Sequence, residues 1–169
     1  MSDLGEQLRQ SMRHWPSGVS VVTSAMDGQR HGMTVNSFTS ISLEPPIVAV
    51  TLGHPTRTYR LVHESGVFGV TILSAAQREL SDRFAGRGVN EEDRFEGLDT
   101  VTLATGAPFL AGGLAFVDCR VVYNYAMPAS TLFIGQVVAT RSEPSVEPLI
   151  YLNRSYYDLT HDLRTAKPG

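Results

Sequence analysis

The chain has 169 residues, of which 42% are hydrophobic and 18% charged, and its formal net charge is −3. This length predicts one domain, which we expect over residues 1–158, followed by a tail at 159–169. The composition excludes a disordered or fibrous chain, and the slightly acidic balance argues against nucleic acid as a partner.

The N-terminal segment has the pattern of an amphipathic helix. Leu4, Leu8, Met12 and Trp15 recur at helical spacing, which predicts a helix over residues 3–15 with these side chains on one face.

Short β-branched and apolar runs, separated by turn residues, predict strands through the rest of the chain. A capping box at Ser74 and Gln77 predicts the start of a further helix. The expected strands are 18–25, 31–41, 47–52, 67–73, 114–122, 131–140 and 149–152, the further helices are 56–64 and 75–84, and a charged loop covers 90–99.

The predicted elements indicate a mainly β domain. About seven strands stand against three helices, and strands and helices do not alternate as they do in parallel sheets. Tight turns between strand pairs, such as Asp27-Gly28, favour antiparallel pairing and a barrel-like sheet.

Cysteine content and the N-terminus both bear on the compartment. Cys119 is the only cysteine, which is typical of a reducing environment, and we interpret it as a small apolar core residue. Asp3 and Glu6 are acidic residues at positions where a signal peptide would have its basic and apolar regions, which argues against a signal peptide. The uncharged stretches 100–117 and 121–140 are not continuously apolar, which argues against a membrane span. We therefore expect a cytoplasmic protein without a membrane span.

Several common kinds of site have no counterpart in the sequence. Neither a glycine-rich dinucleotide-binding motif nor a P-loop occurs, and there is no G-x-S-x-G nucleophile motif. The five histidines lack the spacing of metal ligands, and one cysteine cannot complete a zinc set. No metal site is expected.

Residues 31–42 combine many small polar side chains with a few apolar positions. Hydroxyls, an amide and nearby backbone N–H groups can bind a planar heterocycle whose acceptors lie along one edge. A polar-faced edge strand would give the same pattern. The polar side chains of the segment are Thr34, Asn36, Ser37, Thr39, Ser40 and Ser42.

Residues 53–58, with the sequence Gly-His-Pro-Thr-Arg-Thr, follow an apolar strand and open a helix. A helix start with threonine hydroxyls and an arginine fork is typical of a phosphate site. An ordinary N-cap with Arg57 in solvent is the alternative. Because the two polar segments flank one buried strand, a bound flavin nucleotide would span both.

Seven short motifs that are typical of one protein family occur in order along the chain, at 16–23, 32–42, 44–46, 80–86, 118–120, 131–135 and 154–156. On these motifs the chain, from about Arg13 to Tyr157, resembles the flavin reductase-like domain family. Its members are reductase components of two-component flavin-dependent monooxygenases. The resemblance implies an FMN-binding split β-barrel, antiparallel and of Greek-key type, with a few short flanking helices.

The resemblance also implies which residues bind flavin. The isoalloxazine ring would lie against Met33, Thr34, Val35, Asn36, Ser37, Ser40 and Ile41. The ribityl chain would pass beside Thr51, Leu52 and Gly53. The phosphate would be held by Thr56, Arg57 and Thr58. Three further residues would close or reach the site, although Phe84 and Tyr156 also fit plain packing: Arg83, Phe84 and Tyr156.

The implied activity is hydride transfer from NADH or NADPH to FMN or FAD, with reduced flavin passed to a partner oxygenase. Such a protein orients two cofactors, so we expect no catalytic acid or base. The family further implies a homodimer with flavin near the interface. Two alternatives stay open: a flavoprotein that keeps its flavin and acts on an organic substrate, and a flavin-binding module without turnover.

Residues 128–130 depart from the family pattern. Many members carry Gly-Asp-His before the Thr-Leu-Phe-Ile-Gly segment, and that histidine is associated with the nicotinamide. Here the positions are Pro128, Ala129 and Ser130. Ser130 keeps one hydrogen-bonding group and no charged or stacking contact, so we expect altered use of the reductant more than altered flavin binding.

Overall fold

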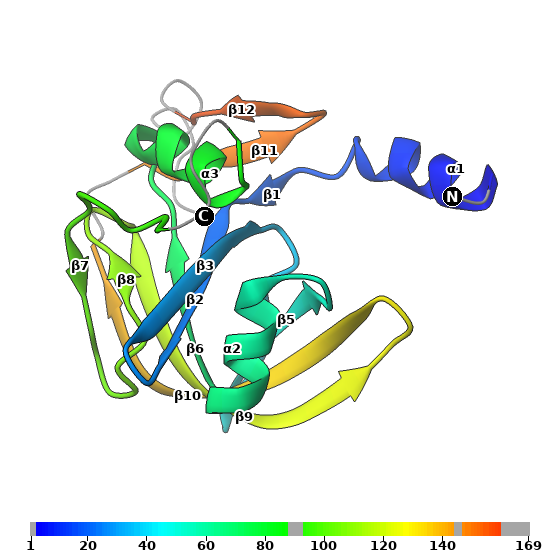
Figure 1. Cartoon of the computed structure of the whole chain (residues 1–169). Helices are drawn as coiled ribbons and strands as arrows, with labels where there is room; N and C mark the ends of the chain where they lie inside the picture. Colours follow the sequence, from blue (N-terminus) through cyan, green and yellow to red (C-terminus); the bar gives the residue numbers. More distant parts are fainter. Residues whose placement is uncertain (1–2, 88–92, 144–146, 160–169) are drawn as a thin grey trace.

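The computed structural model describes residues 3–87, 93–143 and 147–159 (Figure 1). No helix in these ranges is long and apolar enough to cross a membrane. The helices are α1 (Asp3–Met12), α2 (Arg57–Ser65), the 3₁₀ turn η1 (Ala75–Gln77) and α3 (Arg78–Phe84). The strands are β1 (Ser17–Gly18), β2 (Ser20–Met26), β3 (Gln29–Val35), β4 (Thr39–Leu43), β5 (Pro46–Gly53), β6 (Val67–Ile72), β7 (Thr100–Val101), β8 (Phe109–Leu110), β9 (Ala115–Ala126), β10 (Ser130–Ser142), β11 (Ile150–Leu152) and β12 (Ser155–Tyr157).

The main sheet is an antiparallel barrel that is open along one side. Its strand order is β3-β2-β6-β9-β10-β5-β4, so the edge strands β3 and β4 are neighbours in the chain. The four Cα steps from Val35 to Thr39 span at most about 14 Å, and the two edges must therefore lie near each other. The sheet curls as a result, and the expected antiparallel split barrel is confirmed.

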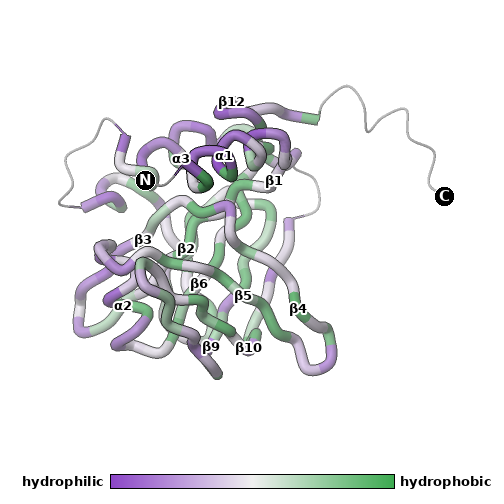
Figure 2. The backbone as a smooth tube through the Cα atoms, turned by 90° about the vertical axis from the view of Figure 1, so that its right-hand side faces the viewer, coloured by the Kyte–Doolittle hydropathy of each residue, from purple (hydrophilic) through white to green (hydrophobic). Residues whose placement is uncertain are grey.

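Two groups of buried side chains form the interior. One group joins α2 to strands of the barrel and includes the fully buried Phe68, Phe133 and Cys119. The other lies around α3 and includes Phe84 and Phe95. Figure 2 shows the apolar character concentrated in β2, β5 and β6. The interpretation of Cys119 as a core residue is confirmed, and burial raises the pKa of its thiol to about 12.

Helix α2 begins and ends close to where the sequence predicts. Thr56 caps its first turn, and its side chain accepts a hydrogen bond from the backbone N–H of Tyr59 at 3.1 Å. Gly66 ends it in the left-handed conformation at φ 68°, which glycine adopts without a steric penalty. Leu61 and Val62 face the barrel. The helix therefore lies over β2 and β3 with its N-terminus at the end of β5 (Figure 1).

The single strand expected over residues 31–41 is wrong, because the chain breaks there into β3 and β4. Ser37 leaves both strands: its Oγ donates to the carbonyl of Thr51 at 3.0 Å and accepts from the N–H of Thr51 at 3.2 Å. The break carries the chain from one edge of the split barrel to the other.

The N-terminal helix is shorter than expected, and its apolar face is uncovered. Helix α1 ends at Met12 and has no buried residue, and Leu4, Leu8 and Trp15 are 74%, 61% and 68% exposed. Figure 1 shows the helix standing away from the barrel.

The charged loop expected at 90–99 is partly anchored. Residues 88–92 lie outside the described ranges. Beyond them, Asp93 accepts a hydrogen bond from the N–H of Phe95 at 2.8 Å, and the Phe95 ring is buried. The expected helix at 75–84 starts as the 3₁₀ turn η1, where the N–H of Ser74 donates to Gln77 Oε1 at 3.1 Å, as the capping box predicts.

Candidate functional site

Three cavities adjoin one another along β3. The largest of them, the central cavity, has a volume of about 420 Å³, within the range of roughly 300–1,000 Å³ typical of small-molecule sites. It is lined by His31, Met33, Thr34, Pro55, Thr56, Arg57, Arg60, Phe84, Ala85 and Arg94. A second cavity, which we call the outer cavity, shares His31, Arg57 and Arg60 with the central cavity and is also lined by Gln29, Arg30, Leu61 and Glu64. A third, which we call the tyrosine cavity, shares Thr34 and Ala85 with the central cavity and is also lined by Tyr151 and Tyr156.

The predicted phosphate residues divide between the cavity and the core. Thr56 and Arg57 line the central cavity at the start of α2, and Thr56 Oγ1 also donates to the carbonyl of Gly53 at 2.8 Å. Thr58 is fully buried, and its hydroxyl is 2.8 Å from His31 Nδ1. Thr58 therefore faces the neighbouring strand β3 and does not line the cavity.

The central cavity is rich in positive charge. Arg57 and Arg60 come from α2, and Arg94 is fixed from the other side, where its Nη1 donates to the carbonyls of Phe84 at 2.7 Å and Gly32 at 3.2 Å. Three guanidinium groups around one space fit an anionic ligand such as a phosphate.

His31 lies among these arginines and is uncharged near neutral pH. Burial, followed by the charges of Arg94 and Arg57, lowers the pKa of His31 to about 4. Its buried ring therefore serves as a neutral hydrogen-bond partner of Thr58, and the arginines alone supply positive charge to the cavity.

The central cavity also has apolar lining residues, which are packed tightly. Met33 and Phe84 line it, and the Phe84 ring meets the Phe95 ring edge-on at 5.0 Å between centroids. A Cβ at Gly32 would lie 3.0 Å from Phe84, so only glycine fits there without displacing the ring. A cavity that is lined by both arginines and apolar side chains suits a nucleotide that carries a flat ring system.

The tyrosine cavity brings together further predicted residues. It has a volume of about 180 Å³ and is lined in part by Thr34, Val35, Asn36 and Tyr156. The Tyr156 hydroxyl is 2.8 Å from Ser81 Oγ and donates to Asp82 Oδ1 at 3.0 Å. Tyr156 thus joins the C-terminal segment to α3 beside the central cavity.

The remaining predicted residues do not line these three cavities. Ser37 and Thr51 bond to each other, and Gly53 accepts the bond from Thr56. Leu52 is fully buried, whereas Ser40 and Ile41 are exposed on β4. Arg83 is turned toward the anchored loop, where its Nη2 donates to the carbonyl of Glu96 at 2.7 Å.

Ser130 begins β10 and is paired with Gly53, so it lies next to the start of α2. His54 does not replace the missing family histidine, because its ring contacts the opposite face of β10. There its Nε2 is 3.0 Å from Thr131 Oγ1, and its ring packs on Tyr59.

Five of the ten residues that line the central cavity were not predicted as site residues, and three of them, His31, Arg60 and Arg94, carry ionisable side chains. Arg60 carried a usable signal, since a residue three positions after Arg57 lies on the same helix face. His31 carried none, because only the pairing of β3 brings it to the site. Arg94 belongs to the charged loop, for which the sequence favours a solvated loop over contact with a cofactor, and the anchoring of this loop brings Arg94 to the cavity. In the described ranges we find no group of three or more His, Cys, Asp or Glu that could hold a metal ion.

Known proteins of similar sequence and structure bear on this geometry. A family model described as flavin reductase like domain matches residues 12–160. The reductase component of FADH(2)-dependent resorcinol hydroxylase from Rhizobium sp. (strain MTP-10005) is 36% identical over 155 residues, 90% of this chain and 86% of that protein. The FMN reductase (NADH) RutF 2 of Methylorubrum extorquens (strain PA1) is 36% identical over 148 residues, 88% of this chain and 86% of that protein.

A solved structure agrees with these relatives. The NADH:FAD oxidoreductase SgcE6 of Streptomyces globisporus C-1027 superposes with a TM-score of 0.84 at 31% identity, over 93% of this chain and 94% of that one.

Proposed function

This chain belongs to the flavin reductase like domain family, and we propose that it is the NADH-dependent flavin reductase component of a two-component monooxygenase. In the reaction a hydride passes from the nicotinamide to oxidised flavin, a proton comes from solvent, and NAD⁺ and reduced flavin leave. The observation that carries the proposal is the central cavity, whose arginines and apolar side chains fit the phosphate and the ring of a flavin.

The residues of this chain bind and orient the reactants. We assign the flavin phosphate to Thr56 and Arg57, with Arg94 facing them, and the ring to the side of Met33 and Thr34. Holding two rings in contact supplies most of what hydride transfer needs, because the reactive atoms belong to the cofactors. No general acid or base is assigned.

The nicotinamide is assigned to the side of the flavin nearest Ser130. Support comes from the family resemblance, since Ser130 occupies the position of the histidine that is associated with the nicotinamide; in this structure Ser130 pairs with Gly53, directly before the start of α2. A serine there can donate one hydrogen bond but cannot stack or carry charge, so the chain would bind NADH more weakly than a member with histidine at this position.

A homodimer belongs to the same proposal. Apolar side chains stand exposed on α1 and on the far half of the β9–β10 hairpin, including Leu8, Met12, Tyr123 and Tyr125. Exposed apolar surface of this extent is typical of a contact with another protein surface. A cytoplasmic location is also proposed, since Cys119 is a buried free thiol and the substrate NADH is intracellular.

The function is tested by following NADH consumption in the near ultraviolet, with purified protein and with FMN, FAD or neither. We expect NADH loss that depends on added flavin and on protein. Tight flavin binding without NADH loss would contradict the reductase and support one of the other flavoprotein functions. Adding a separate oxygenase component then checks whether the reduced flavin is transferred.

A further inference from the structure

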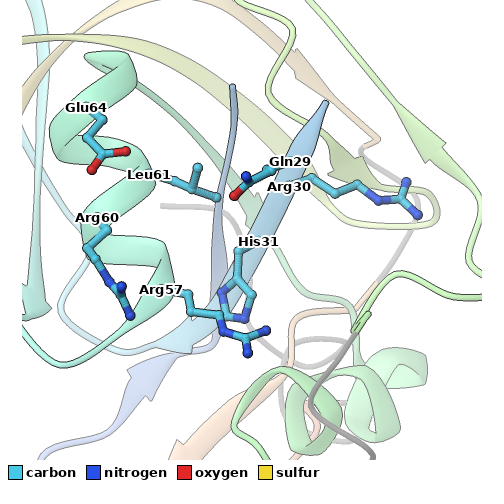
Figure 3. Close-up of a pocket in the computed structure, with 7 residues that line it drawn as sticks. All are labelled: Gln29, Arg30, His31, Arg57, Arg60, Leu61 and Glu64. Atoms are coloured by element: carbon cyan, nitrogen blue, oxygen red, sulfur yellow. The ribbon is translucent and has the colours of Figure 1, made fainter. Parts of the chain in front are cut away.

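The outer cavity continues the central cavity away from the flavin ring. It has a volume of about 360 Å³ and lies between β3 and the exposed face of α2 (Figure 3). His31, Arg57 and Arg60 line both cavities, so the two spaces meet where the flavin phosphate is assigned. A ligand whose phosphate sits at Arg57 can therefore extend into the outer cavity without leaving the protein surface.

Along the outer cavity the charge of the lining residues of α2 changes from positive at the N-terminal end of the helix to negative at its C-terminal end. Arg57 and Arg60 are three residues apart on α2, so their guanidinium groups follow each other along one helix face. Glu64 lies one turn further, at the end of the same face (Figure 3). Two cationic groups in succession match two linked phosphates, and the carboxylate beyond them would repel a third phosphate.

The walls beyond the arginines suit a nucleoside. Leu61 is nearly buried and gives the cavity an apolar floor, and Gln29 on β3 faces it from the other side. A glutamine amide can donate to N7-type acceptors and accept from the amino group of adenine, and a carboxylate such as that of Glu64 can accept from ribose hydroxyls.

Arg30 lines the same cavity but has its own partners. Its guanidinium points away from α2 in Figure 3, donates to Asp93 Oδ2 at 3.2 Å and lies 4.8 Å from the centre of the Phe95 ring. The cationic part of the outer cavity is therefore the α2 side.

We infer that the outer cavity binds the adenosine monophosphate part of FAD, so that this chain takes FAD in preference to FMN. The inference rests on the proposed function and deepens it. One relative is named for FMN and the solved structure for FAD, so similarity leaves the choice open. NADH contains the same group, but the continuity through Arg57 with the flavin phosphate residues assigns the cavity to flavin.

The test compares dissociation constants of oxidised FAD and FMN, measured by titration calorimetry in the absence of NADH. The unmodified chain should bind FAD about tenfold more tightly than FMN, and ADP should displace FAD. Arg60→Gln and Gln29→Ala should each bring the ratio of the two constants to roughly threefold or less, with Gln29→Ala leaving FMN unchanged. Arg120→Gln, which removes an exposed arginine on β9 outside both cavities, should keep the full ratio.

Equal constants for FAD and FMN in the unmodified chain, or an unchanged ratio in both variants, would overturn the inference. A higher KM for NADH in the variants with the flavin ratio unaltered would also overturn it, by assigning the cavity to NADH. These results are separate from the reductase activity. FAD preference without NADH oxidation refutes only the proposed function, and NADH oxidation with no preference refutes only the FAD site.

Discussion

Neighbouring residues of one motif have different tasks in this protein. Thr56, Arg57 and Thr58 all look like phosphate ligands in the sequence, yet helix geometry turns each in a different direction. Thr56 caps α2 at the edge of the central cavity, Arg57 lines the cavity, and Thr58 faces the core and meets His31. The charge that holds a phosphate therefore depends on Arg57 and on residues from other segments.

Replacing Arg57 should weaken flavin binding more than it slows turnover. Arg57→Gln is expected to raise the KM for FMN by about tenfold or more, because a charge-assisted hydrogen bond contributes roughly 1.5–3 kcal/mol. Steady-state kinetics at saturating NADH measure this. Arg57→Lys keeps the positive charge and loses the two-pronged guanidinium group, so its KM for FMN should lie between those of the unmodified chain and of Arg57→Gln. A KM for FMN that does not rise in Arg57→Gln would contradict the phosphate assignment.

Restoring the family residues at the start of β10 tests the nicotinamide side. Ala129→Asp combined with Ser130→His should lower the KM for NADH several-fold and leave flavin binding as it is. The measurement is the NADH dependence of the rate at fixed flavin, with Ala129→Asp alone as the control. If the double substitution leaves this KM unmoved, the nicotinamide lies elsewhere.

His31 should make the free energy of unfolding depend on pH. Its pKa is about 4 in the fold, through burial and the charges of Arg94 and Arg57, against 6.5 in an unfolded chain. The unfolded chain therefore takes up the proton first, and the stabilisation present above pH 6.5 is lost as the pH falls toward 4. Between pH 7 and pH 5 the loss should be on the order of 1–2 kcal/mol.

Denaturant unfolding at several pH values measures that loss. His31→Gln should make the free energy of unfolding change less between pH 7 and pH 5. His63→Gln, at an exposed position of α2, should leave this pH dependence as it is in the unmodified chain. If the free energy of unfolding depends on pH in the same way in the unmodified chain and in both variants, His31 is not the cause of the pH dependence.

The strands show where close packing shapes an element. The pairing of β10 with β9 shifts in register between Ile134 and Gly135, and there the strand runs against a fully buried ring of β6. A Cβ at Gly135 would lie 2.5 Å from Phe68 Cζ and 3.0 Å from Cys119 Cβ. Glycine fits this position because Phe68 of β6 and Cys119 of β9 leave no space for a Cβ.

Gly135→Ala should therefore destabilise the barrel. We expect the free energy of unfolding to fall by about 1–3 kcal/mol, the usual cost of overpacking a well-filled core. Gly18→Ala is the matched control, since nothing lies within 4 Å of the added Cβ on β1. Equal stability of the two variants in denaturant unfolding would show that the core around Phe68 can adjust.

At the scale of the whole molecule, the barrel buries its own core but leaves apolar surface at its margins. Helix α1 stands away from the barrel, and Leu4, Leu8 and Met12 on its apolar face are 74%, 61% and 53% exposed (Figure 1). An isolated helix of this length is marginal in water, so its apolar face needs a surface to pack against. A second copy of the chain provides one in the proposed homodimer.

A charge on that face should separate the subunits. Light scattering after gel filtration should give twice the chain mass of 18.4 kDa for the unmodified protein and a monomer for Leu8→Glu. Gln10→Glu introduces the same residue on the opposite side of α1 and should stay dimeric. A monomeric unmodified protein, or a dimeric Leu8→Glu variant, would contradict the role given to this face.

Sequence by itself determined most strands of the main sheet, the start of α2 and the polar segments around the site, because alternation, caps and turn residues act locally. It did not predict the short strands β7, β8 and β12. Short motifs in a fixed order also indicated the family. Only the tertiary structure decided that residues 31–41 divide at Ser37, that Thr58 is buried and that Arg94 reaches the cavity. The physical reason is that barrel closure pairs segments far apart in the chain, and no local pattern records which side chains then meet.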